Sequence, residues 1–168
     1  MTNEILETAE KIHPALASWD ILIILVFLGL SMWYAYTIGK DHIITLMTAL
    51  YISAFPFFFI PGLRDWIPQV EALSPDIIIL IAFGVLFFLT FYFLTRNDFF
   101  AAPIVPSLWE IAVFTILFVG LFTAVVGSLL SPDFFTPSQI VNIAFMSQEA
   151  LLVWSVAPII SYMVIKGN

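Results

Sequence analysis

Few residues of this 168-residue chain are of a type and spacing that could do chemistry. It contains no cysteine, which excludes a thiolate nucleophile, a thiolate metal site and a disulfide framework. Its two histidines, His13 and His42, lie outside the long apolar segments, which excludes a bis-histidine haem site within them. No serine, histidine and aspartate come together in one segment. We therefore predict no catalytic, cofactor-binding or metal-binding residues, and no enzymatic activity.

Two glutamates beside apolar stretches, Glu110 and Glu149, are the carboxylates that could carry protons. Glu110 ends a Ser107-x-x-Glu110 pattern. In this pattern the serine and glutamate side chains each bond the other's backbone amide at the start of a helix. Capping therefore explains the presence of Glu110, and a role in proton transport is not needed. Glu149 belongs to a polar triplet between two apolar runs. If it lies within hydrocarbon, it should face other helices as a buried ionisable group and be the best candidate functional residue.

Long apolar segments must position these residues. The chain is 62% hydrophobic and 10% charged, with a mean hydropathy of +1.08, which lies outside the range of soluble domains. A helix of about twenty apolar residues spans the roughly 30 Å hydrocarbon core of a bilayer. The segments are continuously apolar and do not alternate, so a β-barrel is excluded. The predicted fold class is all-α, a polytopic transmembrane helical bundle with spans at residues 20–39, 43–61, 76–95, 108–130 and, as a shorter fifth, 148–165.

One transmembrane domain, residues 18–166, follows a short lead-in at residues 1–17. The lead-in carries an apolar stripe at helical spacing opposite glutamates, which predicts an amphipathic helix lying on the membrane surface. Its acidic character differs from the basic start of a cleaved signal peptide, so we expect the first span to remain as an anchor.

Capping and breaking residues mark the ends of the segments. The sequence Ser74-Pro75-Asp76 places a capping serine, a first-turn proline and an early carboxylate at one helix start. Ser18 and Asp20 act similarly before the first span, and the Thr136 to Gln139 sequence repeats the capping pattern. Pro56 predicts a kinked or unwound last turn in the second span.

The last apolar region allows two interpretations. An interfacial helix could give way to a short fifth span near Ser147, or one long tilted helix could carry Glu149 at depth. The polar residues from Ser147 to Glu149 and the later Pro158 favour the first.

Small residues recur at helix-packing spacing in the fourth span. Gly120, Ala124 and Ser128 follow one another at intervals of four residues, and Gly127 precedes Ser131 by four, which lets a neighbouring backbone approach closely. The neighbouring helix belongs either to the same chain or to a second copy of the protein, in which case these residues form a homo-oligomer interface. Phenylalanine-rich stretches at 55–59 and 87–93 fit either packing or a hydrophobic gate.

The charges indicate orientation and limit the partners. A net charge of −7 argues against nucleic acid, and the lipid bilayer is the partner that the apolar spans require. With five spans, three of the five basic residues fall on one side, and most carboxylates on the other. The positive-inside tendency places the N-terminus outside. The basic residues on the inner side are Lys40, Arg96 and Lys166.

The first span carries a pattern that resembles the start of the colicin V production protein family. Trp19-Asp20 leads an apolar span, which ends at Ala35-xxx-Gly39-Lys40 and runs directly into a second span. The resemblance covers residues 19–60, with Ala35 at the place of a family glycine. By this match Asp20, Ala35, Gly39 and Lys40 are the family-motif positions, and the resemblance implies a multi-pass bacterial inner-membrane protein linked to secretion or envelope homeostasis.

The expected function is therefore that of a small non-enzymatic inner-membrane protein of this kind. Two alternatives remain: an oligomeric channel or transporter subunit, and a structural or accessory subunit of a larger membrane complex. An oligomer would use the Gly120 to Ser131 face, whereas an accessory subunit would associate with another membrane protein.

Overall fold

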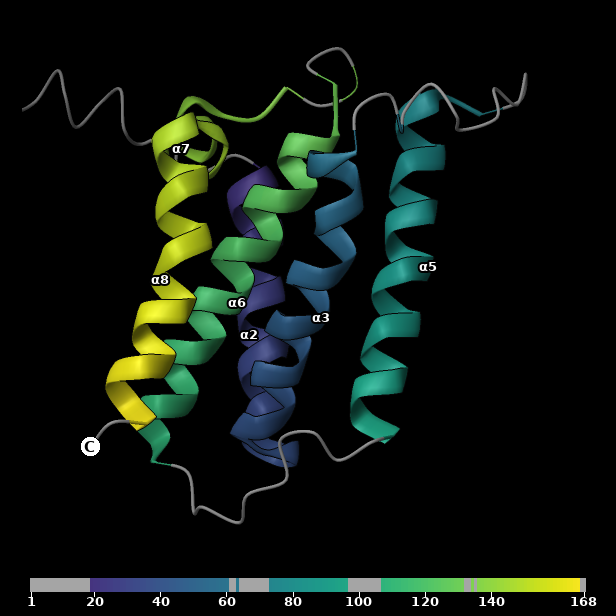
Figure 1. Ribbon diagram of the computed structural model, residues 1–168. Coiled ribbons are helices and arrows are strands. Elements are labelled where there is room, and N and C mark those ends of the chain that lie inside the picture. The colour runs from purple at the N-terminus through teal and green to yellow at the C-terminus, as the bar shows by residue number, and fades with distance from the viewer. Residues whose placement is uncertain are drawn as a thin grey trace, which may run out of the picture.

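The computed structural model describes residues 19–60, 63, 73–96, 107–131, 134 and 136–166. The predicted amphipathic helix at 1–17 lies outside this part of the chain. The described residues form helices and no strand, which confirms the all-α prediction (Figure 1). The helices are α2 (Trp19–Ile38), α3 (Lys40–Phe59), α5 (Pro75–Arg96), α6 (Leu108–Leu129), α7 (Gln139–Val141), the π-helix η1 (Asn142–Met146) and α8 (Gln148–Lys166).

Five of these helices, α2, α3, α5, α6 and α8, are long and apolar enough to cross a membrane. They run alternately up and down, so that α2, α5 and α8 begin at the end drawn uppermost, where α7 also lies (Figure 1). We call this the upper end, and the end that holds the α2–α3 turn the lower end. The chain is a multi-pass helical membrane protein.

The core lies around α6 and α3. Helix α6 contacts α2, α3, α5 and α8, and α3 also contacts α5 and α2. Phe114, Leu121 and Leu129 of α6 and Leu50 of α3 are almost fully buried. By contrast α2, α5 and α8 bury few residues and present broad apolar surfaces, as expected where lipid replaces water as the solvent.

Helix α2 turns into α3 through one residue, Gly39. Its φ of 112° is rarely adopted by residues with a Cβ, and its amide donates to the Ala35 carbonyl at 2.9 Å. The second span therefore begins at Lys40, three residues before the predicted start. The prediction treated the polar residues from Lys40 to His42 as a loop, but Asp41 in a first helical turn complements the helix dipole.

Pro56 does not unwind the second span. Helix α3 continues through Pro56 to Phe59, and Ile60 closes it by donating its amide to the Pro56 carbonyl at 3.1 Å. A proline in the last turn removes one helical amide bond, and the final residues tolerate that loss. The last turn is therefore not unwound, and the other form of the expectation, a kink at Pro56, stays a prediction.

A serine cap occurs within the expected Thr136 to Gln139 sequence, at Ser138, but not at Ser74 or Ser107, and a further cap at Ser147 was not predicted. The Ser74 hydroxyl is buried without a hydrogen-bond partner in the described part of the chain, so its predicted capping role was wrong, although its carbonyl accepts from the Ile77 amide at 3.0 Å. The Ser107 hydroxyl makes no capping bond, although its carbonyl accepts from the Ile111 amide at 3.2 Å. The predicted capping role of this exposed hydroxyl was wrong, because water at a helix end can satisfy the first amides instead. Ser138 caps α7 through the Val141 amide, and Ser147 caps α8 through the Ala150 amide at 3.1 Å.

The chain breaks at Ser147, between η1 and α8. Ser147 has an extended backbone, with φ −66° and ψ 154°, so two separate helices lie on either side of it. A break at this point matches the first of the two interpretations of the last apolar region, in which a short helix gives way to a separate fifth span near Ser147. The pair α7–η1 is short, and α8 has the length of a span.

Two carboxylates tie the upper end together. Asp76, in the first turn of α5, accepts from the Ser131 amide at 3.0 Å and from the Ser131 hydroxyl at 2.7 Å. Asp20, in the first turn of α2, accepts from the amides of Ile21 at 3.0 Å and Ser138 at 2.7 Å. Both ends of the α6–α7 connection are thus held by charge-assisted bonds.

Helix α3 holds α8 through Tyr51, whose hydroxyl donates to the Ser155 carbonyl at 2.7 Å. Pro158 lies one turn further along α8 and disturbs the helical bonding of the carbonyls that precede it. We expect Tyr51→Phe to lower the free energy of unfolding by about 0.6–1 kcal/mol, the usual value of such a bond between membrane helices. Unfolding in mixed micelles checks this, with Tyr36→Phe on the exposed surface of α2 as the control. Equal losses in both variants would contradict it.

Candidate functional site: an apolar crevice beside α2

Two adjoining hollows follow one face of α2. The upper cavity, of about 350 Å³, lies between α2, α6 and the α7–η1 pair. The lower groove, of about 610 Å³, lies between α2 and α5, and α3 and α6 form its floor. Trp33 of α2 borders the lower groove, and the other α2 residues that line the two hollows form one stripe at helical spacing: Asp20, Ile23, Ile24, Phe27, Leu30, Ser31 and Tyr34.

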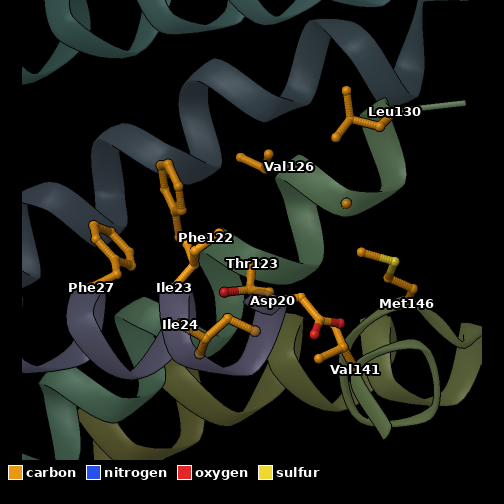
Figure 2. Close-up of a pocket in the computed structure, with 11 residues that line it drawn as sticks. Asp20, Ile23, Ile24, Phe27, Phe122, Thr123, Val126, Leu130, Val141 and Met146 are labelled. Carbon is orange, nitrogen blue, oxygen red and sulfur yellow. The ribbon is translucent and has the colours of Figure 1, made fainter. Parts of the chain in front are cut away.

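The upper cavity has few polar groups in its wall. Figure 2 shows Asp20 and Thr123 as its oxygen-bearing side chains, with Phe27 and Phe122 at one end and Met146 at the other. The Asp20 carboxylate already accepts two backbone amides, so its position is fixed. Asp20 thus places one fixed carboxylate in the wall of an otherwise apolar space.

The α7–η1 pair covers the upper cavity and is anchored to α8. The indole N–H of Trp154 donates to the Ala144 carbonyl at 2.8 Å, and its ring stacks on Phe145 at 5.4 Å between centroids. Met146 lies so close to Gly127 that a Cβ at Gly127 would overlap its side chain. The Ala144 carbonyl lies in the last turn of η1, where helix carbonyls lack an amide partner, and the indole supplies the missing donor.

The α5 wall and the floor of the lower groove carry aromatic rings. Phe83 and Phe87 of α5 and Phe118 of α6 are 3%, 7% and 4% exposed, so their rings are fixed by packing. Gly84, in the α5 wall, has no atom within 4 Å of the position that a Cβ would take. The groove is therefore open at Gly84 and could be filled there without a clash.

Three side chains line both hollows: Phe27, Phe122 and Val126. The rings of Phe27 and Phe122 lie 5.0 Å apart with their planes tilted by 43°. Phe118 supports Phe27 at 5.9 Å, and Phe87 supports Phe122 at 6.3 Å. We call Phe27 and Phe122 the ring pair, because both rings line the upper cavity and the lower groove.

The predicted packing residues lie where α6 meets α8 and η1. A Cβ at Gly120 would overlap the Trp154 ring, and one at Gly127 would overlap Met146. Ala124 is fully buried between them, and the Ser128 hydroxyl donates to the Val125 carbonyl of its own helix at 2.8 Å. Neighbours within the same chain therefore cover Gly120 and Gly127.

Three of the four family-motif positions, Asp20, Ala35 and Gly39, lie where they support the fold. Asp20 holds the start of α7, Ala35 is fully buried, and Gly39 forms the α2–α3 turn. Lys40 is the first residue of α3, and its side chain lies outside the described part. Among the three of these residues whose side chains the structure describes, Asp20 is the one that lines the crevice.

Glu149 is not a buried ionisable group. It is exposed in the first turn of α8, because the break at Ser147 starts that helix just before it. A carboxylate at this position complements the positive end of the helix dipole. Glu110 lies in the corresponding turn of α6, at the opposite end of the bundle.

Three of the buried hydroxyls bond within their own helices and link no helix to another. Thr45, Ser53 and Thr115 each donate to a carbonyl three or four residues earlier in their own helix, at 2.7–3.1 Å. A hydroxyl bonded in this way carries no uncompensated cost in an apolar interior. No group of three or more metal-ligating side chains occurs in the described ranges. Most of the crevice therefore offers shape and apolar contact as its means of recognition.

Comparisons with known proteins found no relative. No protein-family model matches the chain, and neither a curated protein nor a solved structure is significantly similar to it.

The sequence interpretation missed the crevice. The stripe on α2 does have helical spacing, but the rest of α2 is also apolar, so the spacing does not stand out. Gly84 carried no signal of its own. In a membrane helix, apolar residues face lipid and protein alike, and this removes the contrast that marks a buried face in water.

Proposed function

We propose that this chain is a non-enzymatic integral membrane protein that holds the hydrocarbon chain of a lipid in the lower groove. The observation that carries the proposal is the size and lining of the groove. It runs alongside α5 from Leu80 to Phe91, a length of about 16 Å at about 1.5 Å per residue.

The groove has room for a hydrocarbon chain. A chain that follows its length of about 16 Å occupies roughly 240–320 Å³, and the groove provides about 610 Å³. A hydrocarbon chain needs a cross-section of roughly 15–20 Å², given carbon contact distances of about 3.5–4.0 Å.

Packing, not the hydrophobic effect, would retain the hydrocarbon chain of the lipid in the groove. Lipid tails are as apolar as the groove, so entering it removes no further surface from water. The gain is dispersion contact with rings that are already fixed, and Phe83, Phe87 and Phe118 supply them. Modest affinity with selectivity for shape is the expected result.

The proposed setting is the bacterial inner membrane with the N-terminus outside. The lower-end segments carry Lys40, Arg96 and Lys166, and the positive-inside tendency favours a cytoplasmic position for them. The resemblance of residues 19–60 to the colicin V production family supports this setting and a role in envelope homeostasis. A lipid-holding protein without catalytic groups is compatible with that role.

Filling the groove tests the proposal. Gly84→Leu places a side chain where no atom lies within 4 Å, so it should occupy the groove without disturbing the fold. We expect native mass spectrometry of the purified protein with added phospholipid to show binding at least about tenfold weaker than in the wild type, a change of about 1.4 kcal/mol.

Gly29→Leu is the matched control. Gly29 also lies in a spanning helix and has no atom within 4 Å of its Cβ position, but it does not line either hollow. It should bind phospholipid like the wild type. Equal binding by wild type, Gly84→Leu and Gly29→Leu would contradict the proposal.

A further inference from the structure

We infer that the hydroxyls of Ser31 and Tyr34 bind the ester carbonyls of the lipid, so that the lower groove takes its lipid from the leaflet at the lower end. This inference rests on the proposed function. Both residues line the groove from α2, one helical turn apart. A glycerophospholipid joins its chains to glycerol through ester groups, and the carbonyl oxygens of these esters accept hydrogen bonds.

Ser31 is a buried hydroxyl that its own helix does not satisfy. Its side chain is 7% exposed and lines the groove, and it makes no hydrogen bond to any residue that the structure describes. Thr45, Ser53 and Thr115 are similarly buried, and each donates to a carbonyl of its own helix. A hydroxyl in apolar surroundings costs free energy unless it has a partner. Ser31 therefore indicates an acceptor on the molecule that fills the groove.

Tyr34 is a second hydroxyl of this kind. It is half-buried in the same wall, and its hydroxyl likewise has no hydrogen-bond partner among the described residues. Tyr34 lies about 6 Å from the lower end of α2, and Ser31 lies about 10 Å from it. A tyrosine in a membrane keeps its ring in hydrocarbon and its polar tip near the headgroups. The donors of the α2 wall thus lie in the lower half of that helix.

The opposite end of the groove has a different character. The side chains that line it there are apolar, among them Leu80 of α5 and Val126 of α6. Asp76 lies four residues before Leu80, on the same face of α5, and its carboxylate accepts two bonds from Ser131. A lipid phosphate at this end would face a like charge. The headgroup is therefore favoured at the lower end.

The charges at the helix ends agree with this direction. The three spanning helices that begin at the upper end carry carboxylates in their first turns: Asp20, Asp76 and Glu149. At the lower end α5 finishes in the exposed Arg96, and the carboxylates Asp41 and Glu110 share that end. A phosphate thus meets both signs of charge at the lower end and carboxylates at the upper end.

Ether-linked phospholipids test the inference, because they lack the ester carbonyls. Two phosphatidylcholines with the same chain lengths, one diester and one diether, would compete for the purified protein and be read by native mass spectrometry. We expect the wild type to prefer the diester lipid at least about fivefold, the effect of two hydrogen bonds within a membrane. The double variant Ser31→Ala with Tyr34→Phe should bind both lipids equally.

Tyr36→Phe is the matched control. Tyr36 also lies near the lower end of α2, but it is 68% exposed and lines neither hollow. This variant should keep the preference for the diester lipid. A preference that the double variant keeps in full would overturn the assignment of Ser31 and Tyr34.

A second measurement checks the direction of the lipid. Phospholipids with a diazirine either beside the ester group or at the chain end would be activated by light in the presence of the protein. The first should label α2 between Ser31 and Tyr34, and the second should label α5 near Leu80 and α6 near Val126. The reverse distribution, or equal binding of diester and diether lipids by the wild type, would overturn the inference.

Gly84→Leu separates this failure from failure of the proposed function. If the wild type binds both lipids equally and Gly84→Leu weakens the binding of both, the inference is wrong and the proposed function stands. If Gly84→Leu leaves the binding of both lipids unchanged, the proposed function itself is wrong.

Discussion

Gly120→Ala should destabilise the bundle by about 3 kcal/mol. The added Cβ would overlap the six-membered ring of Trp154, and that ring cannot move away freely. It is held by the bond from its indole N–H to the Ala144 carbonyl and by stacking on Phe145. Overpacking a fixed contact typically costs 1–3 kcal/mol, and here the loss falls on the contact between α6 and α8. Unfolding in mixed micelles, followed by circular dichroism, measures it.

Gly29→Ala is the matched control for this loss. No atom lies within 4 Å of a Cβ at Gly29, so the same substitution in α2 should leave stability unchanged or raise it by about 0.5–1 kcal/mol. In a Trp154→Leu background, Gly120→Ala should lose most of its effect, because the overlapping ring is gone. A loss at Gly120 that is the same with and without Trp154 would contradict this explanation.

Asp76→Ala should lower the free energy of unfolding by about 2 kcal/mol. The carboxylate accepts both the amide and the hydroxyl of Ser131, and these bonds hold the end of α6 against the start of α5. Hydrogen bonds to a charged acceptor are worth about 1.5–3 kcal/mol when buried, and Asp76 is half-buried, so the lower end of that range applies. Removing the side chain also leaves the Ser131 amide without this acceptor.

Asp41→Ala is the control for the contribution of the helix dipole. Asp41 also lies in the first turn of a spanning helix, so its removal should cost about 0.3–1 kcal/mol. Ser131→Ala should fall between the two variants, because it removes the hydroxyl bond and keeps the amide bond. Equal losses for Asp76→Ala and Asp41→Ala would show that the tie to Ser131 adds nothing.

The spanning helices could be predicted because the bilayer fixes their length. Helix α6 was expected at 108–130 and ends at Leu129, and α5 was expected at 76–95 and occupies Pro75–Arg96. Hydropathy and capping residues act locally, and Asp76 marked its helix start correctly. The errors lie where local rules compete, as at Lys40, where polar residues continue into a helix.

The crevice could not be predicted because its parts are distant in the sequence. The Asp20 bond to Ser138 joins residues 118 positions apart, and the ring pair joins α2 to α6. The small residues of α6 indicated a close approach but could not identify Trp154 as the neighbour at Gly120. Apolar helices in lipid carry no pattern that separates a groove from a lipid-facing wall.

Photolabelling tests most directly whether the lower groove holds a lipid chain. A phospholipid with a diazirine in the middle of one chain would be reconstituted with the protein, activated by light, and its attachment sites mapped by peptide sequencing. The groove predicts labels concentrated between Leu80 and Phe91 and between Phe118 and Val126, and reduced there in Gly84→Leu but not in Gly29→Leu. Labels spread equally over the exposed face of α8, at Ile160 and Val164, and unchanged by Gly84→Leu would contradict a specific site.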